Sequence, residues 1–119
     1  MSQIDKAFVE NFMHEQISCW NAGDRDGFFA AYRRAAPNGL SIEYVGRPVA
    51  DGWPVLEGMW AQQNARVEVD ELVMIINGSE AALHNRNKVR GSTQAIDTIE
   101  LYRFEDGGRL AVRYFVLHP

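Results

Sequence analysis

A glutamate and an arginine interrupt two apolar stretches near the end of the sequence. Residues 95–115, AIDTIELYRFEDGGRLAVRYF, are rich in strand-forming side chains on both sides of a glycine-containing turn, which predicts a β-hairpin. A two-residue turn at Asp106-Gly107 would place Glu100 directly opposite Arg113 on one face of the sheet. Such a pair is either a structural ion pair or the polar end of a ligand pocket.

If both side chains face a pocket, their charges favour anion recognition over proton donation. Arg113 would hold a carboxylate or enolate oxygen of a substrate, because charge-assisted hydrogen bonds are strong, and Glu100 would orient the guanidinium. A neighbouring arginine also lowers the pKa of a carboxyl, which would make Glu100 a poorer general acid. As a buried structural pair, by contrast, the two charges would each be costly to remove alone.

A second group of polar side chains is predicted on the apolar side of an earlier hairpin. A three-residue turn with a left-handed Gly78 separates polar from apolar residues best, because it pairs Glu71 with Asn85 and places Asn87 beside them. These three side chains are either a satisfied polar network or a site that offers a base and two amides able to position a water.

Three helices are predicted in the first half of the chain. Apolar residues recur at helical spacing from Phe8 to Trp20, and Gly23 suits the left-handed residue that follows a helix. Asp24 is placed to cap a second helix, and Pro54 to occupy the first turn of a third.

The remaining segments are predicted as strands. Residues 40–46 form one short run, and residues 66–118 contain four runs rich in β-branched and aromatic side chains, separated by tight turns. Helices followed by a strand-rich half predict an α+β fold with a curved, mainly antiparallel sheet. We place one domain over residues 1–119, because no linker or repeat divides the chain.

These elements supply further candidates for a site. Gln16 falls on the apolar stripe of the first helix, where its amide would bond either to backbone or to a substrate oxygen. Tyr44 falls on the short strand, as a packing residue or a proton relay. Pocket walls are expected from Trp20, Trp53, Trp60, Asn85, Asn87, Tyr102 and Phe115, although the aromatic residues among them also suit a plain core.

The composition of the chain limits which binding partners, cofactors and cellular compartment we expect. The net charge of −4 gives no reason to expect nucleic acid or an anionic membrane. One cysteine excludes an internal disulfide, and one thiol with scattered histidines predicts neither a metal site nor a cofactor. No signal peptide and no transmembrane stretch is apparent, so we expect a cytoplasmic protein.

The order of three segments resembles that of the nuclear transport factor 2-like superfamily. The segments are WNAGDRDGFFAAY at 20–32, GRPVADGWPVLEGMW at 46–60 and IELYRFEDGGRLAVRYF at 99–115. The resemblance implies a cone-shaped α+β domain in which a curved sheet wraps a long first helix around a pocket. It also implies a choice of functions, because this fold hosts isomerases, cyclases, epoxide hydrolases, dehydratases and non-catalytic binders.

A comparison with the ketosteroid-isomerase branch is sharper. Its oxyanion-binding tyrosine corresponds by position to Gln16, its catalytic aspartate to Glu43-Tyr44, and its protonated aspartate to Glu100. One carboxyl position is therefore kept, one phenol is replaced by an amide, and the base position is ambiguous. These departures argue against ketosteroid isomerisation itself, and the polyketide-cyclase-like (SnoaL-like) members are a looser match.

The function expected from these residues is binding of a small apolar molecule in the cone. As an enzyme, the chain would be an isomerase, cyclase or lyase that acts on an apolar carbonyl compound without a cofactor. Glu100, Arg113 and Gln16 would then bind the oxygen, while Glu71, Glu43 or Tyr44 would handle the proton. The alternatives are a non-catalytic ligand-binding or protein-interaction domain and a structural dimer with a filled cone. A homodimer is expected through the outer, convex face of the sheet.

Overall fold

The computed structural model describes residues 4–117, which form three helices and one six-stranded sheet. The elements follow one another as α1 (Lys6–Ala22), α2 (Arg25–Ala35), β1 (Leu40–Tyr44), β2 (Ala50–Asp51), α3 (Gly52–Gln63), β3 (Val67–Asn77), β4 (Glu80–Val89), β5 (Ala95–Glu105) and β6 (Arg109–Val116). The predicted α+β class is therefore confirmed.

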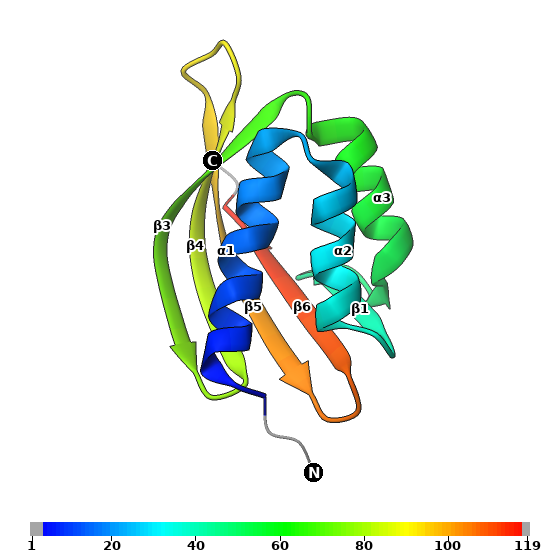
Figure 1. The fold of residues 1–119 in the computed structure, drawn as a ribbon. Helices are drawn as coiled ribbons and strands as arrows, with labels where there is room; N and C mark the ends of the chain where they lie inside the picture. The colour runs from blue at the N-terminus through cyan, green and yellow to red at the C-terminus, as the bar shows by residue number, and fades with distance from the viewer. Residues whose placement is uncertain (1–3, 118–119) are drawn as a thin grey trace.

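The sheet is mainly antiparallel and curls around one side of the helices (Figure 1). Its strand order is β2-β1-β6-β5-β4-β3, and the β1–β6 pair is the parallel one. Helix α1 crosses the inner face of the sheet, with α2 and α3 beside it (Figure 1). This arrangement leaves the inner face of the central strands enclosed by helices. None of the helices described has the length and apolar character needed to cross a membrane.

The helix ends follow the chemistry predicted for them. Gly23, with a φ of 70°, adopts the left-handed conformation after α1, where a residue without a Cβ is favoured. The side chain of Asp24 then accepts a hydrogen bond from Gly27 N at the start of α2. These caps turn the chain sharply, so α1 and α2 pack against each other.

The β5–β6 hairpin has a different register from the predicted one. Glu105 pairs with Arg109, so the loop holds three residues, and both Gly107 and Gly108 adopt a positive φ. This extra residue shifts the pairing by one position. Glu100 lies opposite Tyr114, and Arg113 lies opposite Leu101, so the expected Glu100–Arg113 pair is wrong. The glutamate faces the helices while the arginine faces outward, because alternate residues of a strand point to opposite faces.

The β3–β4 hairpin has the predicted register over half of its length. Its loop holds two residues between Asn77 and Glu80, one fewer than predicted, but a bulge between Glu71 and Val73 offsets the difference. Glu71 therefore lies opposite Asn85 as expected, while the pairing nearer the turn is shifted by one residue.

The core is aromatic and lies between α1, α2 and the inner face of the sheet. Phe12 is in edge contact with Tyr32, Tyr102 and Phe104, at ring-centroid distances of 4.9, 6.0 and 5.6 Å. The predicted pairing of Glu100 with Arg113 would place Tyr114 on the opposite face, but Tyr114 belongs to this interior and is 6% exposed. The core fills one end of the space between helices and sheet and leaves the other end open.

Candidate functional site

A cavity of about 470 Å³ opens between the helices and the inner face of the sheet. Side chains of α1, α2 and α3 and of every strand except β2 line it, with Arg66 from the segment between α3 and β3. Its size lies in the range of small-molecule sites, and its wall is mainly apolar with a few convergent polar groups. This open space argues against one of the alternatives, a structural dimer with a filled cone.

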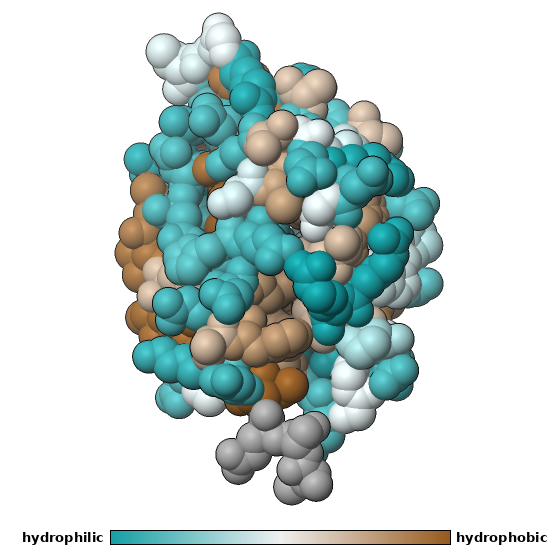
Figure 2. All heavy atoms as spheres, viewed as in Figure 1, coloured by the Kyte–Doolittle hydropathy of each residue, from teal (hydrophilic) through white to brown (hydrophobic). Residues whose placement is uncertain are grey.

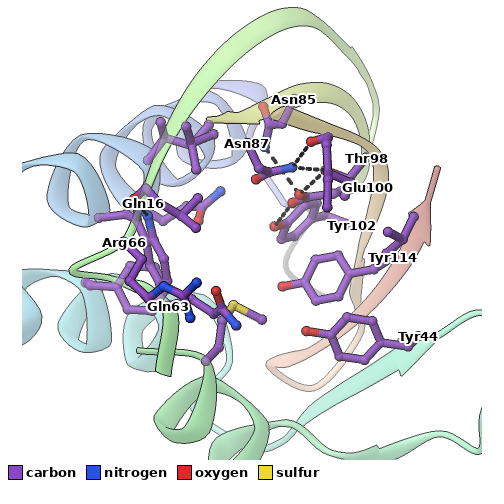
Figure 3. A pocket seen from close by; sticks show the side chains of 18 of the residues that line it. Gln16, Tyr44, Gln63, Arg66, Asn85, Asn87, Thr98, Glu100, Tyr102 and Tyr114 are labelled. Atoms are coloured by element: carbon purple, nitrogen blue, oxygen red, sulfur yellow. Dashed lines mark hydrogen bonds between the residues drawn. The ribbon is translucent and has the colours of Figure 1, made fainter. Parts of the chain in front are cut away.

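Glu100 supplies a buried carboxyl to the wall of this cavity. The side chain is 8% exposed. Its Oε1 accepts a hydrogen bond from the hydroxyl of Tyr102 at 2.8 Å, while its Oε2 accepts from Thr98 Oγ1 at 2.9 Å and from Asn85 Nδ2 at 3.3 Å (Figure 3). With a single donor, Oε1 keeps a free lone pair for a further partner.

Burial sets the ionisation of Glu100. Removal from water raises the pKa of this carboxyl above its ordinary value, and the hydrogen bonds from Tyr102, Thr98 and Asn85 oppose that rise. The sequence-based expectation of a pKa lowered by Arg113 is wrong, because the arginine lies on the other face. Glu100 is therefore suited to exchange a proton nearer to neutral pH than an exposed glutamate.

Tyrosine hydroxyls continue the polar region from Glu100 along the cavity wall. The hydroxyls of Tyr32 and Tyr102 lie 3.5 Å apart, and the rings of Tyr44 and Tyr114 lie 5.1 Å apart, centroid to centroid. Burial raises the pKa of each of these four phenols, and Glu100 is a further cause. They remain neutral. The hydroxyls of Tyr32 and Tyr102 already donate to Gln16 Oε1 and Glu100 Oε1, so Tyr44 and Tyr114 are the phenols that can donate to a ligand oxygen.

Gln16 brings an amide to the same cavity from α1. Its Oε1 accepts a 3.3 Å hydrogen bond from the Tyr32 hydroxyl. The amide nitrogen points toward the centre of the cavity (Figure 3), and no acceptor for it occurs among residues 4–117. The apolar stripe of α1 thus carries a donor directed at the ligand space.

Two asparagines occupy neighbouring inward positions on β4. Asn87 Nδ2 donates to Ile96 O and Thr98 Oγ1, and thereby closes the network on that side. Asn85 is 3% exposed, and its Oδ1 has no hydrogen-bond partner within the described chain. A buried acceptor without a partner is costly, so this atom provides a place for a donor on a ligand or a water.

Several residues predicted for the site lie elsewhere. Arg113 Nε bonds to Glu43 Oε1 at 3.0 Å on the outer face, and the Arg113 guanidinium lies over the ring of Phe115. Glu71 pairs with His14 Nδ1 at 3.2 Å, outside the cavity lining.

Two tryptophans predicted as pocket wall also lie outside the lining. Trp60 packs behind the wall, with its ring 5.2 Å from that of Trp20, and Trp53 packs against the core from α3. Of the predicted wall residues, the cavity brings together Trp20, Asn85, Asn87 and Tyr102, in addition to Gln16, Tyr44 and Glu100.

Five polar residues of the lining were not predicted as part of the site. Thr98 and Tyr114 share a face with Glu100 once the three-residue turn is known, so the turn length is the signal that would have found them. Tyr32 shares helical spacing with Phe28 and Phe29, and this spacing is the signal that could have found it. Gln63 shares a helical face with Leu56 and Met59, which is its signal, whereas Arg66 follows from the packing of α3 on the sheet, for which the sequence gives no local pattern.

The described residues contain no group of three or more histidine, cysteine, aspartate or glutamate side chains that could hold a metal ion. The polar groups of the cavity wall include one carboxyl, several phenols and amides, the hydroxyl of Thr98 and one guanidinium.

Comparison with known proteins identifies the fold. No protein-family profile and no curated protein sequence matches the chain. Among solved structures, a SnoaL-like protein of unknown function from Burkholderia thailandensis is 18% identical, with a TM-score of 0.70 and coverage of 98% of this chain and 100% of that one. An NTF2-like protein of unknown function from Cytophaga hutchinsonii is 16% identical, with a TM-score of 0.67 and coverage of 98% and 93%.

An enzyme also has this architecture. An LEH-like epoxide hydrolase from M. tuberculosis is 14% identical, with a TM-score of 0.66 and coverage of 93% of this chain and 84% of that one. At these identities the similarity concerns the fold, because one fold carries many activities. The fold of this chain is that of the nuclear transport factor 2-like proteins, as its resemblance to them predicted.

Proposed function

From this fold and its open cavity, we propose that the chain binds a small apolar carbonyl compound and transfers a proton on it without a cofactor. The activity would be that of an isomerase, cyclase or lyase. One observation carries the proposal: a buried carboxyl with a raised pKa, Glu100, lines a ligand-sized cavity that is otherwise apolar and phenolic. The epoxide hydrolase that shares the fold supports a role in small-molecule chemistry.

The proposed reaction begins with Glu100 in its ionised form. The free lone pair of Oε1 removes a proton from the carbon next to the carbonyl group, and the electrons of that C–H bond move onto the carbonyl oxygen as an enolate. The resulting carboxylic acid returns the proton, either to the same carbon or to another one. Since Glu100 is the carboxyl that lines the cavity in the described chain, it is assigned both steps.

The enolate oxygen requires hydrogen-bond donors. Gln16 Nε2 points into the cavity from the side of α1, and the neutral phenol of Tyr114 lies on the side of β6 (Figure 3). Donors that are already oriented in a dry site stabilise developing negative charge more than water does. Gln16 takes this role in place of Arg113, whose side chain is 46% exposed on the outer face.

Deuterium exchange tests this proposal. In D₂O, the wild-type chain should accelerate exchange of the protons next to the carbonyl group of 2-tetralone, a flat ketone of cavity size. Glu100→Gln should reduce the acceleration by about a hundredfold or more, which is the usual contribution of an acid–base group. Arg113→Met is the matched control and should retain the wild-type rate.

A binding measurement on the same protein distinguishes the alternative, a non-catalytic binding domain. Binding of 2-naphthol, a stable mimic of the enol of 2-tetralone, without any accelerated exchange would favour it. If neither compound binds to the chain, both the catalytic proposal and the alternative of a binding domain are wrong for flat carbonyl compounds.

We assign the outer face of the sheet to self-association. Cross-strand pairing aligns two mainly apolar rows, Val73–His84–Ile99–Phe115 and Ile75–Ala82–Leu101–Arg113, each of which contains one basic residue. Val73, Ile75 and Ile99 are 52%, 63% and 42% exposed, and Figure 2 shows hydrophobic side chains gathered over β3. Exposed apolar patches of this kind are typical of protein–protein contacts.

Light scattering tests the dimer. Ile99→Glu should yield monomers, whereas Val49→Glu, an equally non-conservative change in the segment after β1, should not. Tyr114 is no probe of this surface, because it points into the cavity. A dimer that survives Ile99→Glu would contradict the assignment.

A further inference from the structure

Two formally charged side chains line the cavity within the described residues, and they lie at opposite sides of it. Glu100 is buried, whereas Arg66 is exposed. Figure 3 shows the Arg66 guanidinium beside the Gln63 amide, across the cavity from Glu100 and Tyr114. The cavity therefore has a polar inner end and a cationic outer end.

The backbone of Arg66 is fixed on both sides of the residue. Its N–H donates to Gln63 O at 3.0 Å, and its carbonyl accepts from Arg90 N at 2.8 Å. These bonds tie the end of α3 to the start of the sheet and hold the side chain at the mouth of the cavity. The backbone of Arg66 is thus held by hydrogen bonds on both sides, although the residue lies in the turn between α3 and β3.

The guanidinium itself has no acidic partner. No carboxylate lies within ion-pairing distance of Arg66 in residues 4–117, whereas Arg113 and Arg86 pair with Glu43 and Asp97. A guanidinium presents five N–H donors in a planar fork that matches the two oxygens of a carboxylate. Gln63 offers an additional amide next to it.

We propose that Arg66 binds a carboxylate at the outer end of the ligand, while the carbonyl or hydroxyl end of the same ligand lies at Glu100. The ligand is then an elongated apolar compound with an anionic end, a narrower class than the apolar carbonyl compound proposed above. This inference rests on the proposed function for the position of the inner end. Ile17, Met59 and Val67 line the cavity and suit the ring or chain that joins the two ends.

Binding of three naphthalenes tests the inference. The probes are 6-hydroxy-2-naphthoate, which has a hydroxyl and a carboxylate at opposite ends, its methyl ester, and 2-naphthol. The wild-type chain should bind the carboxylate about tenfold more tightly than the ester, because charge-assisted hydrogen bonds are stronger than neutral ones. The advantage should decrease at high salt, because the site is exposed.

Two variants distinguish a specific contact with Arg66 from the general attraction of a positively charged surface. Arg66→Met should remove the preference for the carboxylate and leave the affinity for 2-naphthol unchanged. Arg90→Met is the matched control, because it removes an arginine at the same end of the molecule that does not line the cavity. It should retain the preference.

Three results would overturn the inference: equal affinity of the wild type for acid and ester, a preference that persists in Arg66→Met, or no binding of any of the three probes. Failure of the proposed catalysis is distinguishable. An Arg66-dependent preference for the carboxylate without accelerated exchange of 2-tetralone would support the inference and contradict the catalytic role of Glu100.

Discussion

The hydroxyl of Tyr102 donates a 2.8 Å hydrogen bond to Glu100 Oε1, and both side chains point from β5 into the cavity. Thr98, two residues before Glu100, donates to the other carboxyl oxygen at 2.9 Å. Because alternate residues of a strand share a face, a single strand supplies the carboxyl and two of its donors. Asn85 from the neighbouring strand completes the set.

Because the pKa of Glu100 is raised, the stability of the chain should depend on pH. The folded state holds this proton to higher pH than the unfolded chain, in which the pKa is near the ordinary value of 4.5. The contribution of the group to stability is therefore complete below that value and is lost as pH rises through the folded pKa. Glu100→Gln carries no such proton.

Urea unfolding of both proteins from acidic to neutral pH measures this effect. The free energy of unfolding of the wild type, relative to Glu100→Gln, should fall as the pH rises above the ordinary glutamate value and level off once the folded group has ionised. Curves that run parallel throughout would mean that Glu100 titrates as an exposed carboxyl does.

Tyr102→Phe should raise the pKa of Glu100 further. The phenol hydrogen bond favours the ionised carboxyl, so its loss leaves burial less opposed. If Glu100 acts as the base, the rising limb of the pH–rate profile for 2-tetralone exchange should move to higher pH. The cost in stability should be about 1 kcal/mol, the usual value of one hydrogen bond. If the rising limb of the profile stays at the wild-type pH in a variant that is folded, Tyr102 does not influence the proton transfer.

The turn that sets the register of β5 and β6 is testable through its glycines. Gly107 and Gly108 both have a positive φ, at 81° and 76°, where a residue with a Cβ is strained. A Cβ on Gly108 would also lie 2.9 Å from Pro37 Cγ and from Asn38 Nδ2, whereas one on Gly107 would meet open space.

Gly107→Ala should therefore cost about 1–2 kcal/mol for backbone strain alone. Gly108→Ala should cost more, since the contact with Pro37 adds to the same strain. Denaturant midpoints measure both variants. If both variants cost the same, residues 37–38 move away from the added Cβ without a loss of stability.

The fold could be predicted from the sequence because its signals are local. Gly23, Asp24 and Pro54 each act through the conformation or the hydrogen bonds of their own turn, and the helix ends predicted at these three residues are confirmed. The inward position of Glu100 also follows locally, from its spacing to the apolar Tyr102 and Phe104 on the same strand.

The site could be predicted only in part, because register and packing are not local. The sequence EDGGR is compatible with loops of two or three residues, and this single difference moved Arg113 to the outer face and Tyr114 into the cavity. The bulge after Glu71 has no sequence signature of its own. Arg66 joins the cavity because α3 packs on the sheet, which no spacing along the chain specifies.

Direct titration of Glu100 tests the central claim, that a buried carboxyl with a raised pKa faces the ligand space. Side-chain carboxyl carbons of glutamate can be labelled with ¹³C and followed by NMR against pH, with Glu100→Gln identifying the resonance. We expect one glutamate resonance, missing in the variant, that titrates at higher pH than the others and shifts when 2-naphthol is added. A Glu100 resonance that titrates with the exposed glutamates and does not respond to 2-naphthol would contradict it.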